Sequence, residues 1–138
     1  MRKRFFTKVG FDYTETFSPV VRYDSIHILL AIAANENLKV SQFDIKTAFI
    51  NGILSEEIYM QLLEDIDTGN DRMVCKLNKA LYSLKQAARC WNKQFHKFLQ
   101  RFNFQQSNAD RCVYLDQFEG EKMYLALYVD DGLIIALS

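Results

Sequence analysis

"MYLALYVDDGLIIAL", residues 123–137, places two adjacent carboxylates inside an otherwise apolar run. Strand-forming residues lie on both sides of Asp130, Asp131 and Gly132, which predicts a β-hairpin with a tight turn. Asp and Gly tolerate the positive φ of such turns, so turn formation is the simplest interpretation of the acidic pair. It does not explain why the pair is flanked by strands apolar enough to be buried.

Two neighbouring carboxylates in a low-dielectric setting repel each other, and burying them without a counter-charge costs several kcal/mol. A divalent cation such as magnesium, which prefers oxygen ligands, is the natural counter-charge. Asp44 ends another apolar strand, residues 39–45, and would add a third carboxylate. Such a cluster can hold two cations roughly 3.5–4 Å apart. The metal hypothesis requires Asp44 to meet the hairpin, whereas a metal-free structural domain is the alternative if it does not.

Length and composition fit one small domain of 138 residues, with 49% apolar and 14% aromatic residues. The 25% of charged residues excludes general disorder. Seventeen Lys and Arg residues balance seventeen Asp and Glu residues, so bulk charge gives no support for a nucleic-acid binder. Neither a signal-peptide apolar region nor a span of roughly 20 apolar residues is found. We expect a protein that is not secreted, in the cytosol or nucleus, with no membrane partner.

The cysteines and histidines do not indicate a metal or disulfide framework. Three cysteines at wide spacing, without a C-x-x-C motif, are expected to be reduced thiols in the core. His27 and His96 are interpreted as packed or surface side chains rather than ligands.

Hydrophobic periodicity and turn signals predict a mixed α+β chain with hairpins. The first predicted element is a helix that begins at Asp24 or Ser25 and ends within 35–38, where Asn37 can adopt the left-handed conformation. The other predicted elements are strands at 39–45, 56–62, 73–77, 111–118 and 122–129, a helical turn in 47–54, a surface loop at 64–71 and a second helix at 81–102. The second helix carries a basic stripe four residues apart, which is either a solvated face or a contact for nucleic acid: Lys85, Arg89, Lys93, Lys97 and Arg101.

Several motifs occur in order along the chain: "DYTETFSPVVRYDSI" (12–26), "FDIKTAFINGILSEEIYM" (43–60), "LNKALYSLKQAARCWN" (77–92), "DRCVYL" (110–115) and "LALYVDDGLI" (125–134). Together they resemble the reverse transcriptase of copia-type LTR retrotransposon Pol polyproteins, from about residue 11 to the end. The resemblance implies a reverse transcriptase-like palm, in which an antiparallel sheet with the YVDD hairpin is backed by helices.

The implied activity is that of an RNA-directed DNA polymerase, a nucleotidyltransferase that adds deoxynucleotides to a primer on an RNA or DNA template. It would use two Mg²⁺ ions, with Mn²⁺ as a possible substitute. By resemblance, Asp44 and Asp130 would bridge both metals and the Ile45 carbonyl would complete the shell. Asp131 would be a weaker or indirect ligand.

The resemblance also implies a nucleotide site. Phe49 matches the aromatic residue under the incoming sugar, where a ribose 2′-hydroxyl would collide with the ring; core packing is the alternative. The backbone N–H groups of Thr47 and Ala48 would face the triphosphate at a helix start. Tyr82, Lys85 and Gln86 match the motif that lies against the nascent base pair.

The resemblance also assigns three further positions. Ser83 stands where the family has glycine. Its side chain would narrow the nucleotide pocket. Tyr128 would support the primer terminus, with packing an equal alternative. Arg89, in the basic stripe, would contact the template.

The chain also departs from the family pattern. Its basic fingers region is shortened, and "YMQLLEDID" (59–67) replaces a proline-and-glycine turn. The chain ends seven residues after Asp131, so residues 1–138 are expected to be a partial domain without thumb or RNase H. The strand "LIIALS" (133–138) would then be an apolar sheet edge.

Two functions remain open. One is a polymerase palm within a Pol polyprotein that also supplies thumb, RNase H and integrase, in cytoplasmic virus-like particles or in the nucleus. The other is an inactive, truncated relic that binds metal or nucleic acid at most. On either interpretation the 138 residues alone are not expected to be an active enzyme.

Overall fold

A computed structural model describes residues 17–62, 73–118 and 120–137. The predicted surface loop at 64–71 and the basic N-terminal residues lie outside the described residues. The elements, in chain order, are α1 (Tyr23–Glu36), β1 (Lys39–Asp44), the 3₁₀-helix η1 (Ala48–Asn51), β2 (Ile53–Gln61), β3 (Val74–Lys79), α2 (Ala87–Gln100), β4 (Gln105–Gln106), β5 (Val113–Phe118), β6 (Glu121–Tyr128) and β7 (Asp131–Ala136). The predicted α+β class with antiparallel sheets is confirmed.

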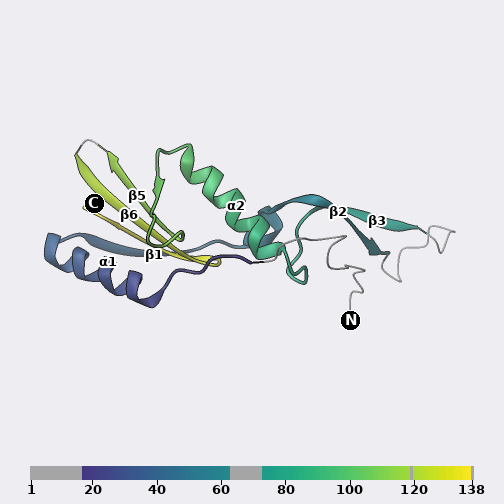
Figure 1. Cartoon of the computed structure of the whole chain (residues 1–138), viewed down its shortest axis with the longest axis horizontal. Coiled ribbons are helices and arrows are strands. Elements are labelled where there is room, and N and C mark those ends of the chain that lie inside the picture. Colours follow the sequence, from purple (N-terminus) through teal and green to yellow (C-terminus); the bar gives the residue numbers. More distant parts are fainter. Residues whose placement is uncertain (1–16, 63–72, 119, 138) are drawn as a thin grey trace.

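The strands form a five-stranded antiparallel sheet in the order β1-β7-β6-β5-β4 and a separate two-stranded hairpin, β2-β3. The β2-β3 hairpin extends away from the main sheet (Figure 1). The prediction that "LIIALS" forms a sheet edge is wrong. β1 pairs with β7 along its whole length, from Lys39 opposite Ala136 to Asp44 opposite Asp131. The backbone groups of β7 are therefore satisfied on both sides, and β1 and β4 are the edges.

The two long helices cover opposite faces of the main sheet (Figure 1). Leu29 and Ala33 of α1 pack with Val113, Ala126 and Ile135 on one face. The other face is covered by α2, whose buried residues share a cluster with side chains of β5 and β6: Trp91, Phe95, Leu99, Tyr114, Leu125 and Leu127. This alternation of side chains between two faces is the normal consequence of the strand pleat. It gives the chain one continuous sheet between two apolar layers.

A third cluster joins the β2-β3 hairpin to the start of α2 through Ile58, Ala80, Leu84 and Cys90. Gly52 lies where this hairpin begins, and an added Cβ would stand 2.8 Å from the backbone nitrogen of Trp91. The predicted turn at Asn51–Gly52 therefore depends on glycine because of close backbone packing against α2, not because of a positive φ.

Helix boundaries differ from the predictions for identifiable reasons. α2 begins at Ala87 rather than residue 81, because Leu81–Gln86 form turns, with the Leu84 N–H bonding the Leu81 carbonyl at 3.0 Å. The N-cap of α1 is Arg22, which has no capping side chain of its own. Asn37 ends α1 in the left-handed conformation, as predicted (φ 56°, ψ 38°).

Candidate functional site

The three aspartates singled out from the sequence lie at one end of the main sheet. Asp44 ends β1 directly opposite Asp131, the first residue of β7. The Ile45 N–H donates to the Asp130 carbonyl at 2.9 Å, which ties the end of β1 to the hairpin turn. Directly opposed residues of an antiparallel pair share a face, with Cβ atoms about 4.5–5.5 Å apart. The chain therefore brings carboxylates separated by more than eighty positions to one edge of the sheet.

These carboxylates are not buried, contrary to the expectation from the flanking apolar residues. Asp44 and Asp131 are exposed and Asp130 is half-buried. The hairpin turn lies at the open end of the sheet, so water reaches groups that follow directly on buried strands. Solvated carboxylates do not require a counter-charge, which removes the burial argument for a cation. Within the described ranges, no group of three or more His, Cys, Asp or Glu side chains is arranged to hold a metal ion.

The turn between β6 and β7 is formed by Val129 and Asp130, with Tyr128 opposite Asp131. The positive φ of the turn lies on Val129 (61°), not on an aspartate or on Gly132 as the turn interpretation implied. Gly132 is needed for another reason: an added Cβ would lie 2.1 Å from Cζ of Phe43, whose ring covers it from β1. The acidic pair is thus not explained by turn preference alone.

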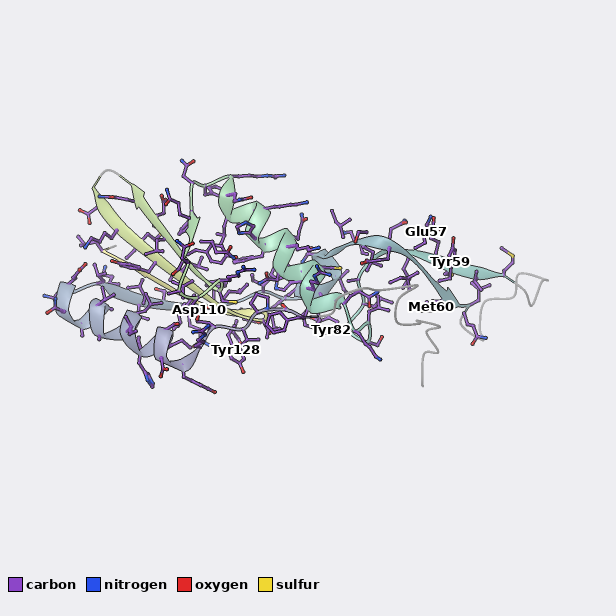
Figure 2. The ribbon with its side chains drawn as sticks, in the orientation of Figure 1. Glu57, Tyr59, Met60, Tyr82, Asp110 and Tyr128 are labelled. Carbon is purple, nitrogen blue, oxygen red and sulfur yellow. The ribbon has the colours of Figure 1, made fainter. Side chains whose placement is uncertain are left out.

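A hollow of about 320 Å³ lies beside the aspartates, on the face of the sheet that α1 covers. Tyr128 and Asp131 line it together with Gln42 of β1 and Tyr23 of α1. Tyr128 is 45% exposed, and Figure 2 shows it beside the start of α1. The hollow provides open space next to Asp131.

The residues assigned to a nucleotide lie on the neighbouring part of the molecule, towards the β2-β3 hairpin. The rings of Phe49 and Tyr82 are in contact, with centroids 4.7 Å apart. Phe49 is half-buried and packs against two core clusters, whereas Tyr82 is 54% exposed. Thr47 precedes η1 in the left-handed conformation (φ 58°), and Ala48 is fully buried. The aromatic pair combines a packing role with an exposed ring face.

Gln86 and Arg89 line a different groove, between α2 and β2, together with Glu56 and Lys93. The Gln86 side chain is only 1% exposed, and its amide atoms have no hydrogen-bond partner in the part of the chain that the structure describes. Ser83 and Lys85 are exposed in the turns before α2. The structure therefore separates these residues from the hollow beside Asp131.

Asp110 has a role that sequence reasoning missed. Its carboxylate accepts hydrogen bonds from the Arg22 N–H (2.9 Å), the Ser25 hydroxyl (2.7 Å) and the Cys112 N–H (3.0 Å). Burial raises the pKa of Asp110, but these hydrogen bonds and the Arg22 charge outweigh burial and lower it overall. Asp110 thus caps α1 from a distance of 88 residues. The only signal was an isolated acid directly before the apolar strand of "DRCVYL".

All three cysteines are free thiols, and Cys90 and Cys112 are buried. Burial raises the pKa of the Cys112 thiol to about 12, since a thiolate is poorly solvated in the core. In the described segments, no helix is both long and apolar enough to cross a membrane.

Comparison with known proteins identifies the family. The model of the family described as reverse transcriptase (RNA-dependent DNA polymerase) matches residues 1–138. The chain is 47% identical over 135 residues to the retrovirus-related Pol polyprotein from transposon TNT 1-94 of Nicotiana tabacum, covering 96% of the chain and 10% of that protein. It is 40% identical over 126 residues to the corresponding polyprotein from transposon RE1 of Arabidopsis thaliana, covering 91% of the chain and 9% of that protein.

A second Arabidopsis thaliana polyprotein, from transposon RE2, is 39% identical over 126 residues, 91% of the chain. The chain thus spans about a tenth of the length of these curated relatives. No solved structure gives a significant match. The chain belongs to the reverse transcriptase family of copia-type retrotransposon Pol polyproteins.

Proposed function

We propose that this chain forms the palm of an RNA-directed DNA polymerase, which extends a primer on an RNA or DNA template with deoxynucleoside triphosphates. Asp44, Asp130 and Asp131 are the catalytic carboxylates of this proposal. The observation that carries it is the register of β1 against β7, which places Asp44 opposite Asp131. A hydrogen bond from the Ile45 N–H to the Asp130 carbonyl connects the same two segments.

The donor set fits magnesium in kind, because carboxylate and carbonyl oxygens are the ligands that this hard cation prefers. Asp44, Asp130 and Asp131, with the Ile45 carbonyl, would hold two Mg²⁺ ions, or Mn²⁺ in their place. Exposure of Asp44 and Asp131 leaves them open to a ligand that arrives from solvent. Bound divalent ions would lower the pKa of the primer hydroxyl and neutralise charge on the phosphates. The protein's own contribution is to bring Asp44 and the acidic pair to one end of the main sheet through strand pairing.

The contact between Phe49 and Tyr82 supports an aromatic nucleotide site on the part of the molecule towards the β2-β3 hairpin. We assign Phe49 to the sugar, since a packed ring cannot move aside for a 2′-hydroxyl. Tyr82 offers an exposed ring face for stacking on a base. Thr47 and Ala48 are assigned to the triphosphate, and Ala48 requires a rearrangement for this role because it is fully buried.

Other contacts are assigned by position. Ser83, Lys85 and Gln86 are assigned to the nascent base pair, Tyr128 to the primer terminus and Arg89 to the template. Gln86 requires a rearrangement for this role, because its amide is buried. The thumb, RNase H and integrase would come from the remainder of a Pol polyprotein in a virus-like particle or nucleus.

A second candidate is a module without catalysis that binds a divalent ion or nucleic acid. The exposed carboxylates of Asp44 and Asp131 can retain a cation from solvent without forming a catalytic centre. The two candidates differ in whether the carboxylates support chemistry or only retain a cation.

Primer extension tests the proposal. We would insert residues 1–138 into the TNT 1-94 polyprotein in place of the matching region and measure extension on an RNA template with Mg²⁺ or Mn²⁺. Asp130→Asn should reduce extension by roughly a hundredfold or more, because the substitution removes one of the negative charges that would hold the metal ions. Asp116→Asn is the matched control: it lies on β5 and keeps the oxygen that accepts from the Gln117 N–H. Equal extension by both variants would disprove the catalytic assignment.

The second candidate predicts a different result. Extension would be absent in the chimaera, yet Mg²⁺ would raise the thermal midpoint of the 138-residue chain, and Asp130→Asn would remove that increase. A chain that shows neither extension nor stabilisation by the cation would refute both the polymerase and the cation-binding function.

A further inference from the structure

Trp91 contacts the turn between β6 and β7 from the face of the sheet that α2 covers, opposite the face with the hollow. It lies on α2 and is only 6% exposed. Its indole Nε1–H donates a hydrogen bond to the carbonyl oxygen of Val129 at 2.7 Å. A buried indole N–H normally finds a partner, but here the partner belongs to the turn that carries Asp130. The contact links a core residue of α2 to the backbone next to the carboxylates.

The residue that Trp91 holds has an unfavourable conformation. Val129 has φ 61°, in the left-handed region. For a β-branched residue this region is a genuine outlier, and such strain persists only where surrounding contacts fix it. Glycine is usual at the first position of a two-residue turn with positive φ. The Val129 conformation therefore requires a stabilising contact from outside the turn.

Two neighbouring carbonyls of the turn are bound by two different elements. The Val129 carbonyl accepts from Trp91 of α2, and the next carbonyl, of Asp130, accepts from the Ile45 N–H after β1. The orientation of one peptide plane is set by the helix and that of the next by the edge strand. The directions in which the Asp130 and Asp131 side chains leave the backbone follow from these planes.

We propose that Trp91 is a positioning residue: its indole N–H fixes the strained turn and thereby the direction of the Asp130 and Asp131 carboxylates. The consequence for metal binding rests on the proposed function, but the consequence for turn conformation does not. The hydrogen bond from Trp91 couples movement of α2 to the orientation of the carboxylates. The same helix carries Arg89, which the proposed function assigns to the template.

The chain contains a single tryptophan, which permits a precise test. Replacing it with 3-benzothienylalanine keeps the size of the ring but substitutes sulfur for the N–H, so packing is retained and the donor is lost. We expect the carbonyl carbon resonance of Val129 and the amide resonance of Asp130 to shift. We also expect the affinity for Mn²⁺, measured by paramagnetic broadening at Asp130 and Asp131, to fall roughly three- to tenfold, as for one lost hydrogen bond.

Two further variants separate positioning from general packing. Phe95→Leu perturbs the same core cluster, since its ring lies 5.3 Å from that of Trp91. It should lower the thermal midpoint while leaving Mn²⁺ affinity unchanged. Val129→Gly removes the strain. Replacing Trp91 with the analogue should therefore lower the Mn²⁺ affinity less in the Val129→Gly background than in the wild type.

The outcomes are distinguishable. Unchanged Val129 and Asp130 resonances in the analogue would overturn the positioning role whatever the metal does. If the wild-type chain shows no Mn²⁺ broadening at the turn, the metal assignment of the proposed function fails, and the resonance shifts alone decide the role of Trp91. A loss of affinity in Phe95→Leu equal to that in the analogue would reduce Trp91 to an ordinary core residue and overturn the inference.

Discussion

Two aspartate regions at the same end of the main sheet have opposite environments. Asp110, just before β5, is 6% exposed and accepts three hydrogen bonds. Asp131, at the start of β7, is exposed beside a hollow. The first carboxylate has its acceptors engaged by the protein, while the second is open to solvent and ligands. The difference shows how one residue type serves structure at one position and remains available for chemistry at another.

The largest expected effect comes from removing the buried carboxylate. Asp110→Ala leaves a buried donor at Cys112 and part-buried donors at Arg22 and Ser25 without their acceptor, and it removes the cap of α1. Each unsatisfied buried donor costs about 1–3 kcal/mol, so we expect the free energy of unfolding to fall by about 3 kcal/mol. Urea denaturation followed by circular dichroism measures this loss.

Asp131→Ala is the matched control, because the residue type and the end of the sheet are the same. Its free energy of unfolding should change by no more than about 0.5 kcal/mol, as at exposed positions generally. Similar losses in the two variants would contradict the division between a structural and an available carboxylate.

A smaller effect is expected at the glycine that follows the exposed pair. Gly132→Ala places a Cβ 2.1 Å from the Phe43 ring, which must move. Overpacking of this kind costs typically about 1–3 kcal/mol. In a Phe43→Ala background the same substitution should cost much less, because the obstructing ring is gone. Urea denaturation of the four proteins of this double-mutant cycle measures the coupling, and additive costs would refute the steric explanation.

The parts of the fold that were predicted from sequence are those set by local pattern. The strand-forming residues on both sides of the Asp-Asp-Gly turn predicted the hairpin in 123–137, and Asn37 predicted the end of α1. Features set by distant contacts were missed, because no local signal reports them. Asp110 caps a helix 88 residues away, and the pairing that makes β7 an interior strand depends on β1.

The positions of the candidate site residues were predicted only in part. Residue types and spacing indicated the aspartates, and the register brings Asp44 opposite Asp131. Their exposure was predicted wrongly, because flanking apolar residues do not reveal that a turn lies at the open end of a sheet. The φ of Val129 and the Trp91 contact depend on tertiary packing, which overrides the turn preferences of Asp and Gly.

The smallest expected effect is the pH dependence that the buried carboxylate contributes. The pKa of Asp110 is lowered in the folded chain from its ordinary value of 3.8, so the unfolded chain binds this proton more readily. The stabilisation is therefore fully present above about pH 4 and is lost as pH falls through the folded pKa. Asp110→Asn lacks this titration but keeps one acceptor oxygen. Its deficit in unfolding free energy against the wild type should be constant from pH 7 to about pH 5 and narrow below pH 4. Urea denaturation at a series of pH values measures the deficit, and a deficit that grows on acidification would mean that burial, not hydrogen bonding, dominates at Asp110.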